Sequence, residues 1–241
     1  MSIQQTIQGY RDLAAHLRNA IVQGEYTPGS QLPGEIQISH TCGLNRHTVR
    51  AALAELEKEG LVYKVQGKGT FVAIRKIPYT LSPKTSFSAT LDQLGLRGQP
   101  DLRSIHCIPG PREITRELGL RAKAPVWKLE ILRRIEDFPV CLTTSWLSAE
   151  RFPELDRHLR PFRSLYEVLT SKYDLQKIRR ASSHIEAALP GKHESDLLGC
   201  SPQLPLLITH SLATDADNTP LEIAHSVARS DAYTLHVTFD T

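Results

Sequence analysis

The sequence predicts two domains: an N-terminal domain of three helices and a β-hairpin, and a larger C-terminal α+β domain with an antiparallel sheet. Three observations support this fold class. Apolar residues recur at helical spacing through the first 60 residues. A glycine-rich turn then separates two short β-rich segments. Beyond residue 86, strands joined by short connections alternate with helices, which is typical of an α+β domain.

The composition is that of an ordinary folded chain, with 40% hydrophobic and 23% charged residues among 241. No apolar run approaches the roughly 18 residues that span a bilayer, and the first residues lack the basic and apolar regions of a secretory signal. The four cysteines are scattered without a CxxC pair, so reduced thiols are expected in place of disulfides or a zinc site. We therefore expect a cytoplasmic protein with no metal or other cofactor.

The net charge of +3 belongs to the N-terminal third. Residues 1–76 carry nine Lys and Arg against six Asp and Glu, whereas the remainder carries twenty of each. A domain that binds a polyanion needs an excess of positive charge, and this excess lies in the N-terminal third. A chance distribution of three charges is the alternative.

The first helices are delimited by turn and capping residues. Residues 10–23 show helical spacing and precede a glycine, and a Pro- and Gly-rich connector leads to a short helix over 35–40. Asn45 is a good N-cap for a further helix that runs to about residue 59. Two helices joined by a short Gly-containing turn predict a helix-turn-helix.

The second helix of this pair has two different faces. Val49, Leu53 and Leu56 form an apolar stripe with steps of four and three residues. Polar and basic side chains occupy the first turns, and this is the part of a recognition helix that enters the major groove. Arginine there can donate two hydrogen bonds to guanine. A solvated helix face is the alternative. The exposed set comprises Arg46, His47, Thr48 and Arg50.

Residues 61–73 predict a β-hairpin that serves as a wing beside the recognition helix. Glycine permits the tight turn, and a lysine at the tip can approach the sugar-phosphate backbone. A nucleotide-binding phosphate loop is excluded because the GxxxxGK[ST] pattern and its strand-to-helix context are absent. The tip consists of Gln66, Gly67, Lys68 and Gly69.

The run LPGEIQISHTCGLNRHTVRAALAELEKEGLVYKVQGKGTFV resembles the GntR family of winged helix-turn-helix regulators. It contains the LP-x-E opening with Glu35, the R-x-T-V-R recognition helix and the Q-G-x-G-T-F-V wing. The resemblance implies that Arg46, Thr48 and Arg50 contact DNA, with the wing glycines near its backbone. Ile36 stands where many members have Arg or another polar residue, so no phosphate contact is carried over to it.

The predicted boundaries are a winged helix-turn-helix over 1–75, a linker over 76–86 and an effector-binding and dimerisation domain over 87–241. In the last domain the expected helices lie near 87–95, 111–119, 153–159, 164–172 and 191–199. The expected strands lie near 98–108, 125–136, 139–148, 177–189, 204–214, 221–229 and 234–240.

This order of elements resembles the UTRA sensor domain of the HutC branch of the family, which shares its fold with chorismate lyase. Regulators of phosphonate utilisation are similar in the Phe87–Gly95, Leu132–Leu142 and Glu222–Asp231 stretches. The resemblance implies a cavity for a small effector. Members that sense sugar phosphates carry Glu and Tyr where this chain has Thr143–Thr144 and Ala228, and this difference favours a smaller effector.

Paired arginines on two predicted strands are candidates for holding an anion, since their planar donors suit phosphate or phosphonate. Successive strand residues face opposite sides, so only one member of each pair can point into a cavity. The branch usually has R-x-R at the first pair, and the spacing from Asp137 favours Arg134 over Arg133. Arg179 and Arg180 are equally ambiguous. Solvent-facing charges are the alternative.

Glu222 lies in an apolar, β-rich segment and needs a partner or a ligand, because an unpaired buried charge is costly. The resemblance implies that it lines the effector pocket. An ion pair with Arg229 or a strand arginine is the alternative. By the same resemblance, Ser88 matches a small hydroxyl near the start of the first helix of the domain that can donate to an anion. A role as the cap of that helix is the alternative. The predicted effector-binding set is Ser88, Arg133, Arg134, Thr144, Arg179, Glu222 and Arg229.

We expect a homodimeric repressor that binds an inverted repeat in double-stranded DNA and responds to a phosphonate- or phosphate-like anion. No membrane contact and no enzymatic activity are expected, since neither a G-x-S-x-G elbow nor an H-E-x-x-H helix occurs. The alternatives are a UTRA regulator of a sugar phosphate or histidine-catabolism intermediate, a lyase-like enzyme, and metal or redox sensing through Cys107 or Cys141.

Overall fold

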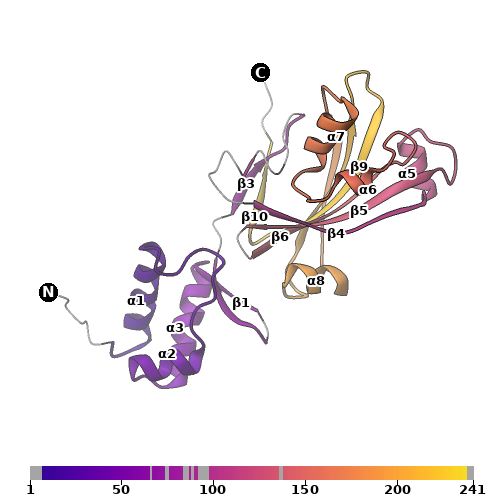
Figure 1. Ribbon diagram of the computed structural model, residues 1–241. Coiled ribbons are helices and arrows are strands. Elements are labelled where there is room, and N and C mark those ends of the chain that lie inside the picture. The colour runs from indigo at the N-terminus through magenta and orange to yellow at the C-terminus, as the bar shows by residue number, and fades with distance from the viewer. Residues whose placement is uncertain are drawn as a thin grey trace. The chain divides into compact units, whose positions relative to one another are not determined.

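The computed structural model describes residues 7–65, 67–73, 76–83, 87, 90–91, 98–135 and 138–237. The chain forms two compact units, Met1–Arg75 and Lys76–Thr241 (Figure 1). Within the described part of the chain, no helix is both long and apolar enough to cross a membrane.

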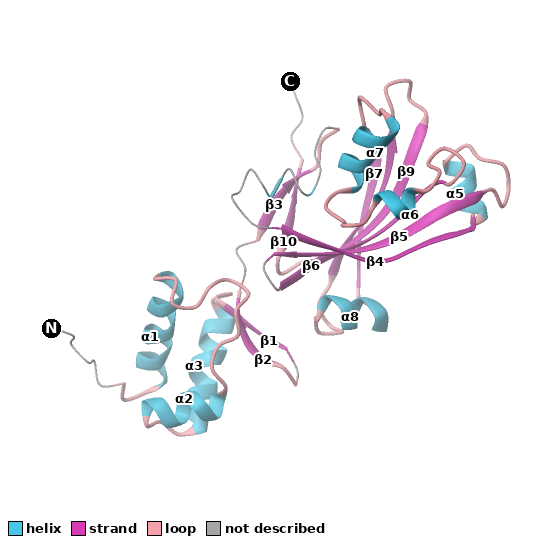
Figure 2. Ribbon diagram, in the orientation of Figure 1, coloured by secondary structure: helices cyan, strands magenta, loops and turns pink. Residues whose placement is uncertain are grey.

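The N-terminal unit packs three helices and a β-hairpin around one core (Figure 2). Val49, Leu53 and Leu56 are fully buried there, so the predicted apolar stripe is confirmed. Burial of that stripe against the first helix and the hairpin is the main stabilising term of a unit this small. The elements are α1 (Tyr10–Val22), α2 (Glu35–Cys42), α3 (Arg46–Lys58), β1 (Val62–Val65) and β2 (Gly69–Val72).

The turn between α2 and α3 is held by local chemistry. Gly43 ends α2 with a φ of 65°, a left-handed conformation that glycine adopts without strain. Asn45 then caps α3, because its side-chain oxygen accepts a hydrogen bond from the Thr48 amide at 2.8 Å. The predicted cap and the helix-turn-helix are both confirmed.

The C-terminal unit is an antiparallel six-stranded sheet in the order β4-β5-β6-β9-β8-β7, which confirms the predicted α+β class. Helices α6 and α7 pack on one face over Leu129 and Ile131, and α8 packs on the other face over Leu132 and Leu142. The strands are β4 (Gly98–Pro109), β5 (Pro125–Ile135), β6 (Phe138–Ser148), β7 (Arg179–Ala188), β8 (Leu206–Thr214) and β9 (Pro220–Arg229). The helices are α5 (Arg112–Glu117), α6 (Leu155–His158), α7 (Leu165–Tyr173) and α8 (Lys192–Leu198).

A separate two-stranded ribbon corrects two expectations. Strand β3 (Ile77–Thr80) lies within the expected linker over 76–86 and pairs in parallel with β10 (Tyr233–His236). The last strand of the chain, β10, was expected in the main sheet, but it pairs with β3 outside that sheet. Ile77 and Tyr79 alternate inward with 1% and 6% exposure, a half-buried strand pattern that the prolines around it obscured. Most of the helix expected over 87–95 lies outside the described residues.

Candidate functional site

The start of α3 presents the predicted polar set to solvent. Arg46 and His47 are exposed in the first turn, whereas the Thr48 hydroxyl is occupied by a hydrogen bond to Asn45 Oδ1 at 3.0 Å. Arg50 is 58% exposed, and its Nε donates to Glu35 Oε2 at 2.7 Å. Glu35 therefore orients an arginine of α3 from α2, and the ion pair reduces the freedom of the Arg50 side chain to move.

The hairpin tip is built by glycines and by a residue that sequence reasoning missed. Gly67 and Gly69 have φ values of 76° and 119°, which other residues rarely adopt. Gln31 lies in the connector before α2, and its Nε2 donates to the Lys68 carbonyl at 2.6 Å. A Cβ at Gly69 would lie 2.7 Å from that nitrogen, so a larger residue there would displace the end of the Gln31 side chain. Gln66 lies outside the described residues.

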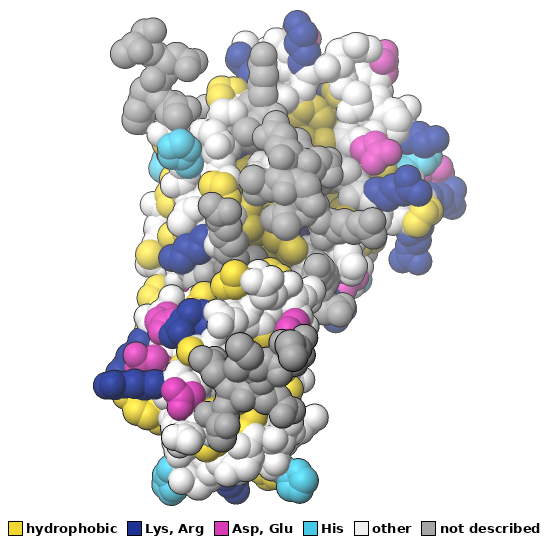
Figure 3. All heavy atoms as spheres, turned by 90° about the vertical axis from the view of Figure 1, so that its left-hand side faces the viewer, with side chains coloured by type: hydrophobic (Ala, Val, Ile, Leu, Met, Phe, Trp, Pro, Cys, Tyr) yellow, Lys and Arg dark blue, Asp and Glu magenta, His cyan; other side chains and the backbone are white. Residues whose placement is uncertain are grey.

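Basic and acidic side chains are interleaved on the N-terminal unit. On the face shown in Figure 3, Lys and Arg lie beside Asp and Glu without forming an unbroken basic patch. The ion pairs between Arg18 and Glu59 and between Arg50 and Glu35 belong to this pattern. The exposed basic residues at the start of α3 and at the hairpin tip are the features of this unit suited to nucleic acid.

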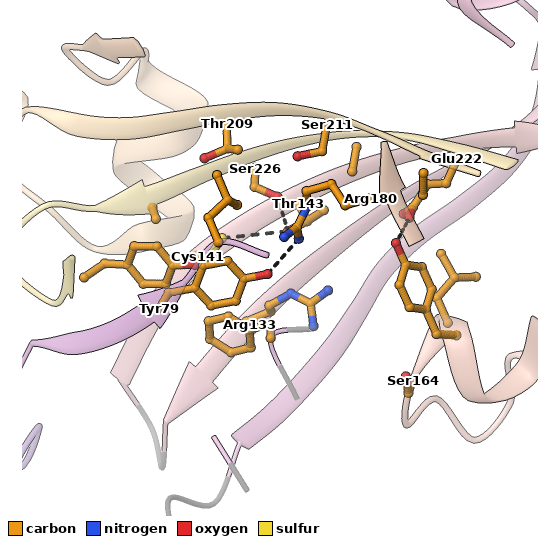
Figure 4. A pocket seen from close by; sticks show the side chains of 18 residues that line it. Tyr79, Arg133, Cys141, Thr143, Ser164, Arg180, Thr209, Ser211, Glu222 and Ser226 are labelled. Atoms are coloured by element: carbon orange, nitrogen blue, oxygen red, sulfur yellow. Dashed lines mark hydrogen bonds between the residues drawn. The ribbon is translucent and has the colours of Figure 1, made fainter. Parts of the chain in front are cut away.

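The C-terminal unit contains a cavity over one face of its sheet (Figure 4). Alternate residues of β6, β8 and β9 form its floor, as the two-residue period of a strand requires. Most floor residues carry small polar side chains, namely Cys141, Thr143, Thr209, Ser211 and Ser226. Three aromatic rings from other segments, those of Tyr79, Phe87 and Tyr233, lie within 5.4 to 6.4 Å of one another at its side.

Glu222 lies in the cavity wall with only 5% exposure. Its two carboxylate oxygens accept hydrogen bonds from Ser145 Oγ at 2.5 Å and from Tyr166 OH at 2.7 Å. Burial and the neighbouring carboxylate raise the pKa of Tyr166 well above its usual value of 10, so the phenol stays a donor. Both hydrogen-bond partners of Glu222 are neutral side chains. Arg229 instead forms its ion pair with Asp231, so the alternative of a Glu222–Arg229 ion pair is wrong.

Of the two arginine pairs, Arg133 and Arg180 line the cavity. The Arg133 guanidinium lies 5.1 Å from the Phe87 ring centre, and no carboxylate among the described residues forms an ion pair with it. Arg134 lines a neighbouring pocket beside Arg163, which corrects the preference for Arg134. Arg179 is exposed and does not line the cavity. Arg133 pairs with Cys141 in the regular part of β5, whereas register shifts lie directly after Arg133 and after Arg180, so alternation does not continue past either arginine.

Two further predicted residues lie away from the cavity. Thr144 is on the opposite face of β6, where it pairs with His225 of β9. Arg229 is buried on the α8 side, donating to Asp231 at 2.9 Å and to the Leu198 carbonyl at 3.1 Å, which is a structural role. Ser88 lies outside the described residues. Burial raises the pKa of the Cys141 thiol, which disfavours the reactive thiolate.

The cavity also contains residues that were not predicted: Tyr79, Ser145, Tyr166 and Tyr233 line it or support Glu222. They come from segments far apart in the chain, and no local motif marks them. The apolar neighbours of Glu222 in the sequence were the only signal that partners were needed.

Comparisons with known proteins match both units. The family model for bacterial regulatory proteins of the gntR family matches residues 9–72, and the UTRA domain matches residues 94–234. The chain is 30% identical to the HTH-type transcriptional repressor NagR of Bacillus subtilis, over 96% of this chain and 95% of that protein. It is also 30% identical to the HTH-type transcriptional regulator GgaR of Escherichia coli, over 93% and 88%. The crystal structure of PhnF from Mycobacterium smegmatis superimposes with a TM-score of 0.66 at 27% identity, covering 95% of this chain and 99% of that one.

Proposed function

The chain belongs to the GntR family of bacterial regulatory proteins with a UTRA domain, and from this we propose that it is a transcriptional repressor whose affinity for DNA is changed by a small anion bound in the cavity of the C-terminal unit. In this proposal Arg46 and Arg50 read DNA from α3, and Lys68 approaches the backbone from the hairpin. A homodimer places two such units on an inverted repeat.

The observation that carries the effector proposal is the environment of Arg133. A half-buried guanidinium in a polar cavity, without a carboxylate partner among the described residues, is a site for an anion. Arg180 lines the same cavity, so two cations flank the space that the effector would occupy (Figure 4). Glu222 at the wall suits a hydroxyl or ammonium group of the same ligand.

A phosphonate or phosphate group at Arg133 is the class we propose first, and a sugar phosphate is the second candidate. The hydroxyls of Thr143, Thr209, Ser211 and Ser226 on the cavity floor favour a ligand with hydroxyls of its own. A relative that is 26% identical, the Escherichia coli repressor MngR of a mannosyl-D-glycerate transport and metabolism system, is also named for a sugar derivative.

The DNA half of the proposal is tested on a duplex selected from random sequences with the full-length protein. Arg46→Ala and Arg50→Ala should each weaken binding to that duplex by about five- to one hundred-fold, since a bidentate contact to a base contributes roughly 1–3 kcal/mol. Lys58→Ala, at the exposed far end of the same helix, is the control for the lost charge. Normal footprints with both arginine variants would refute the assignment of α3.

The effector half is tested by thermal shift with inorganic phosphate, methylphosphonate, glucosamine 6-phosphate and urocanate. We expect at least one phosphorus-containing anion to stabilise the wild-type protein and to change its affinity for the selected duplex. Arg133→Ala should lose both effects, and Arg179→Ala, a matched loss of an exposed arginine, should keep them. If none of these anions stabilises the protein, the proposed anion site is wrong.

A further inference from the structure

Arg180 connects the cavity to the segment that begins the C-terminal unit. Its Nη2 donates to Tyr79 OH at 2.7 Å (Figure 4). Its Nη1 donates to the Ser82 carbonyl at 3.2 Å. Its backbone amide donates to the Pro83 carbonyl at 3.0 Å. One arginine of β7 therefore holds residues 79–83, which are about 100 positions away in the sequence.

The segment that Arg180 holds has a special place in the chain. The DNA-binding unit ends at Arg75, and β3 begins at Ile77, so residues 77–83 are the first part of the C-terminal unit that the chain enters. It is therefore the described part of the C-terminal unit that lies nearest to the DNA-binding unit along the chain. No other described segment of the C-terminal unit has this direct connection along the chain.

The attachment of β3 has two parts. Its backbone pairs with β10, where the Ile77 amide donates to the Ala232 carbonyl at 2.9 Å and the Leu81 amide, just beyond the strand, donates to the His236 carbonyl at 2.8 Å. The second part is the side chain of Tyr79, which stacks on Tyr233 at 5.4 Å and accepts the hydrogen bond from Arg180. The first part uses backbone groups, whereas the second part uses a side chain that lines the cavity.

We infer that Arg180 couples effector binding to DNA binding: an anion in the cavity competes with Tyr79 and Ser82 for its guanidinium and so loosens residues 79–83. The inference rests on the proposed anion sensing and adds how the cavity reports its occupancy. An anionic acceptor adds the attraction between opposite charges to its hydrogen bonds with a guanidinium, and it can accept two of them in parallel. A phenol and a carbonyl oxygen are therefore weaker competitors for the guanidinium than a phosphate or phosphonate oxygen.

Arg133 and Arg180 thus have different tasks. Arg133 stacks on Phe87 and supplies affinity for the anion, whereas Arg180 gives up existing contacts when the anion arrives. Breaking those contacts costs part of the binding energy, and the same cost is what couples the two sites. Removing the Tyr79 hydroxyl should therefore weaken the coupling without weakening the anion site.

The test compares full-length wild-type protein with Tyr79→Phe, which keeps the ring and removes the acceptor. Tyr173→Phe is the control, because the Tyr173 hydroxyl donates to the Pro153 carbonyl in the same unit but does not line the cavity. Methylphosphonate and glucosamine 6-phosphate are the probes. The coupling factor is the ratio of the DNA dissociation constants with and without a saturating probe.

We expect a wild-type coupling factor of at least fivefold, which falls by about threefold or more in Tyr79→Phe. The dissociation constant of the probe itself should stay equal or become smaller in Tyr79→Phe, and Tyr173→Phe should match the wild type. An unchanged coupling factor in Tyr79→Phe would overturn the inference. So would a probe affinity more than fivefold weaker with coupling retained, because Tyr79 would then be a contact of the ligand.

Hydrogen exchange of the Ile77 and Leu81 amides separates this inference from the proposed function. Exchange at both should become faster in Tyr79→Phe without probe, and in the wild type when a probe binds. If a probe binds and changes DNA affinity but exchange does not respond, the proposed function stands and the role of Arg180 is refuted. If neither probe binds the wild type, anion sensing and competition for Arg180 both fail.

Discussion

Tyr166→Phe measures how the buried carboxylate of Glu222 is stabilised. The variant keeps the ring that lines the cavity and removes the hydroxyl that donates to Glu222 Oε2 at 2.7 Å. Glu222 is 5% exposed, so water replaces the lost donor poorly. A hydrogen bond to a charged group contributes roughly 1.5–3 kcal/mol, against about 1 kcal/mol for a neutral pair. We therefore expect the free energy of unfolding of the C-terminal unit to fall by about 2 kcal/mol.

Urea unfolding followed by tryptophan fluorescence is the assay, because both tryptophans, Trp127 and Trp146, lie on strands of the C-terminal unit. With a urea dependence of about 2 kcal/mol per molar, the midpoint should fall by about 1 M. Tyr173→Phe loses a hydrogen bond to a neutral carbonyl and should lower the midpoint by about half as much or less.

A double-mutant cycle with Glu222→Gln decides whether the charge is the cause. In the Glu222→Gln background the cost of Tyr166→Phe should shrink by about 1 kcal/mol, since the donor then meets a neutral amide. The reasoning is refuted if Tyr166→Phe costs no more than Tyr173→Phe and its effect adds to that of Glu222→Gln within about 0.5 kcal/mol.

Three further predictions concern the hairpin and the response to pH. Gln31→Ala removes the hydrogen bond that holds the Lys68 carbonyl, and should weaken binding to the selected duplex about two- to tenfold. The slope of affinity against salt concentration should not change, because no phosphate contact is lost. A changed slope would contradict this role of Gln31. Burial, together with the stacked ring of His210 at 4.4 Å, lowers the pKa of His225 below 6.5. The unfolded chain therefore binds that proton more readily, and the free energy of unfolding should fall as the pH drops below about 6.5. His225→Gln should flatten this fall in urea titrations at pH 7 and pH 5, and an unchanged fall would exclude His225 as its source. The hydrogen bond from Arg151 lowers the pKa of Asp215 below 3.8. The stabilisation by this ion pair is therefore present at neutral pH and is lost as the pH falls below about 3.8. Asp215→Asn should lower the free energy of unfolding at pH 7 and reduce the loss of stability in acid, whereas equal costs at pH 7 and pH 2 would argue against this ion pair.

The DNA-binding unit was predictable because its determinants are local. The stripe of Val49, Leu53 and Leu56 follows from helical periodicity, and the cap by Asn45 involves an amide three residues away. The left-handed glycines of the hairpin tip follow from the absence of a Cβ atom. The long-range contact from Gln31 to the Lys68 carbonyl was not predictable in this way, since 37 positions separate the two residues.

The cavity was predictable only in outline. The sequence identified two arginine pairs and a glutamate that needed partners, but the register of β5 with β6 and a register shift beside Arg180 on β7 decided that Arg133 and Arg180 face the cavity. Ser145 and Tyr166, which donate hydrogen bonds to Glu222, lie 77 and 56 positions away from it in the sequence.

By itself, then, the sequence determined most of the elements, the two-domain order and the residues that present positive charge at the start of α3, because periodicity, caps and turn chemistry act over a few residues. The tertiary structure decided which side chains meet. Strand order placed β6 between β5 and β9, and the parallel pairing of β3 with β10 brought Tyr79 to Arg180. Cross-strand register and bulges set such meetings, and a slip of one residue would reverse every side chain on a strand.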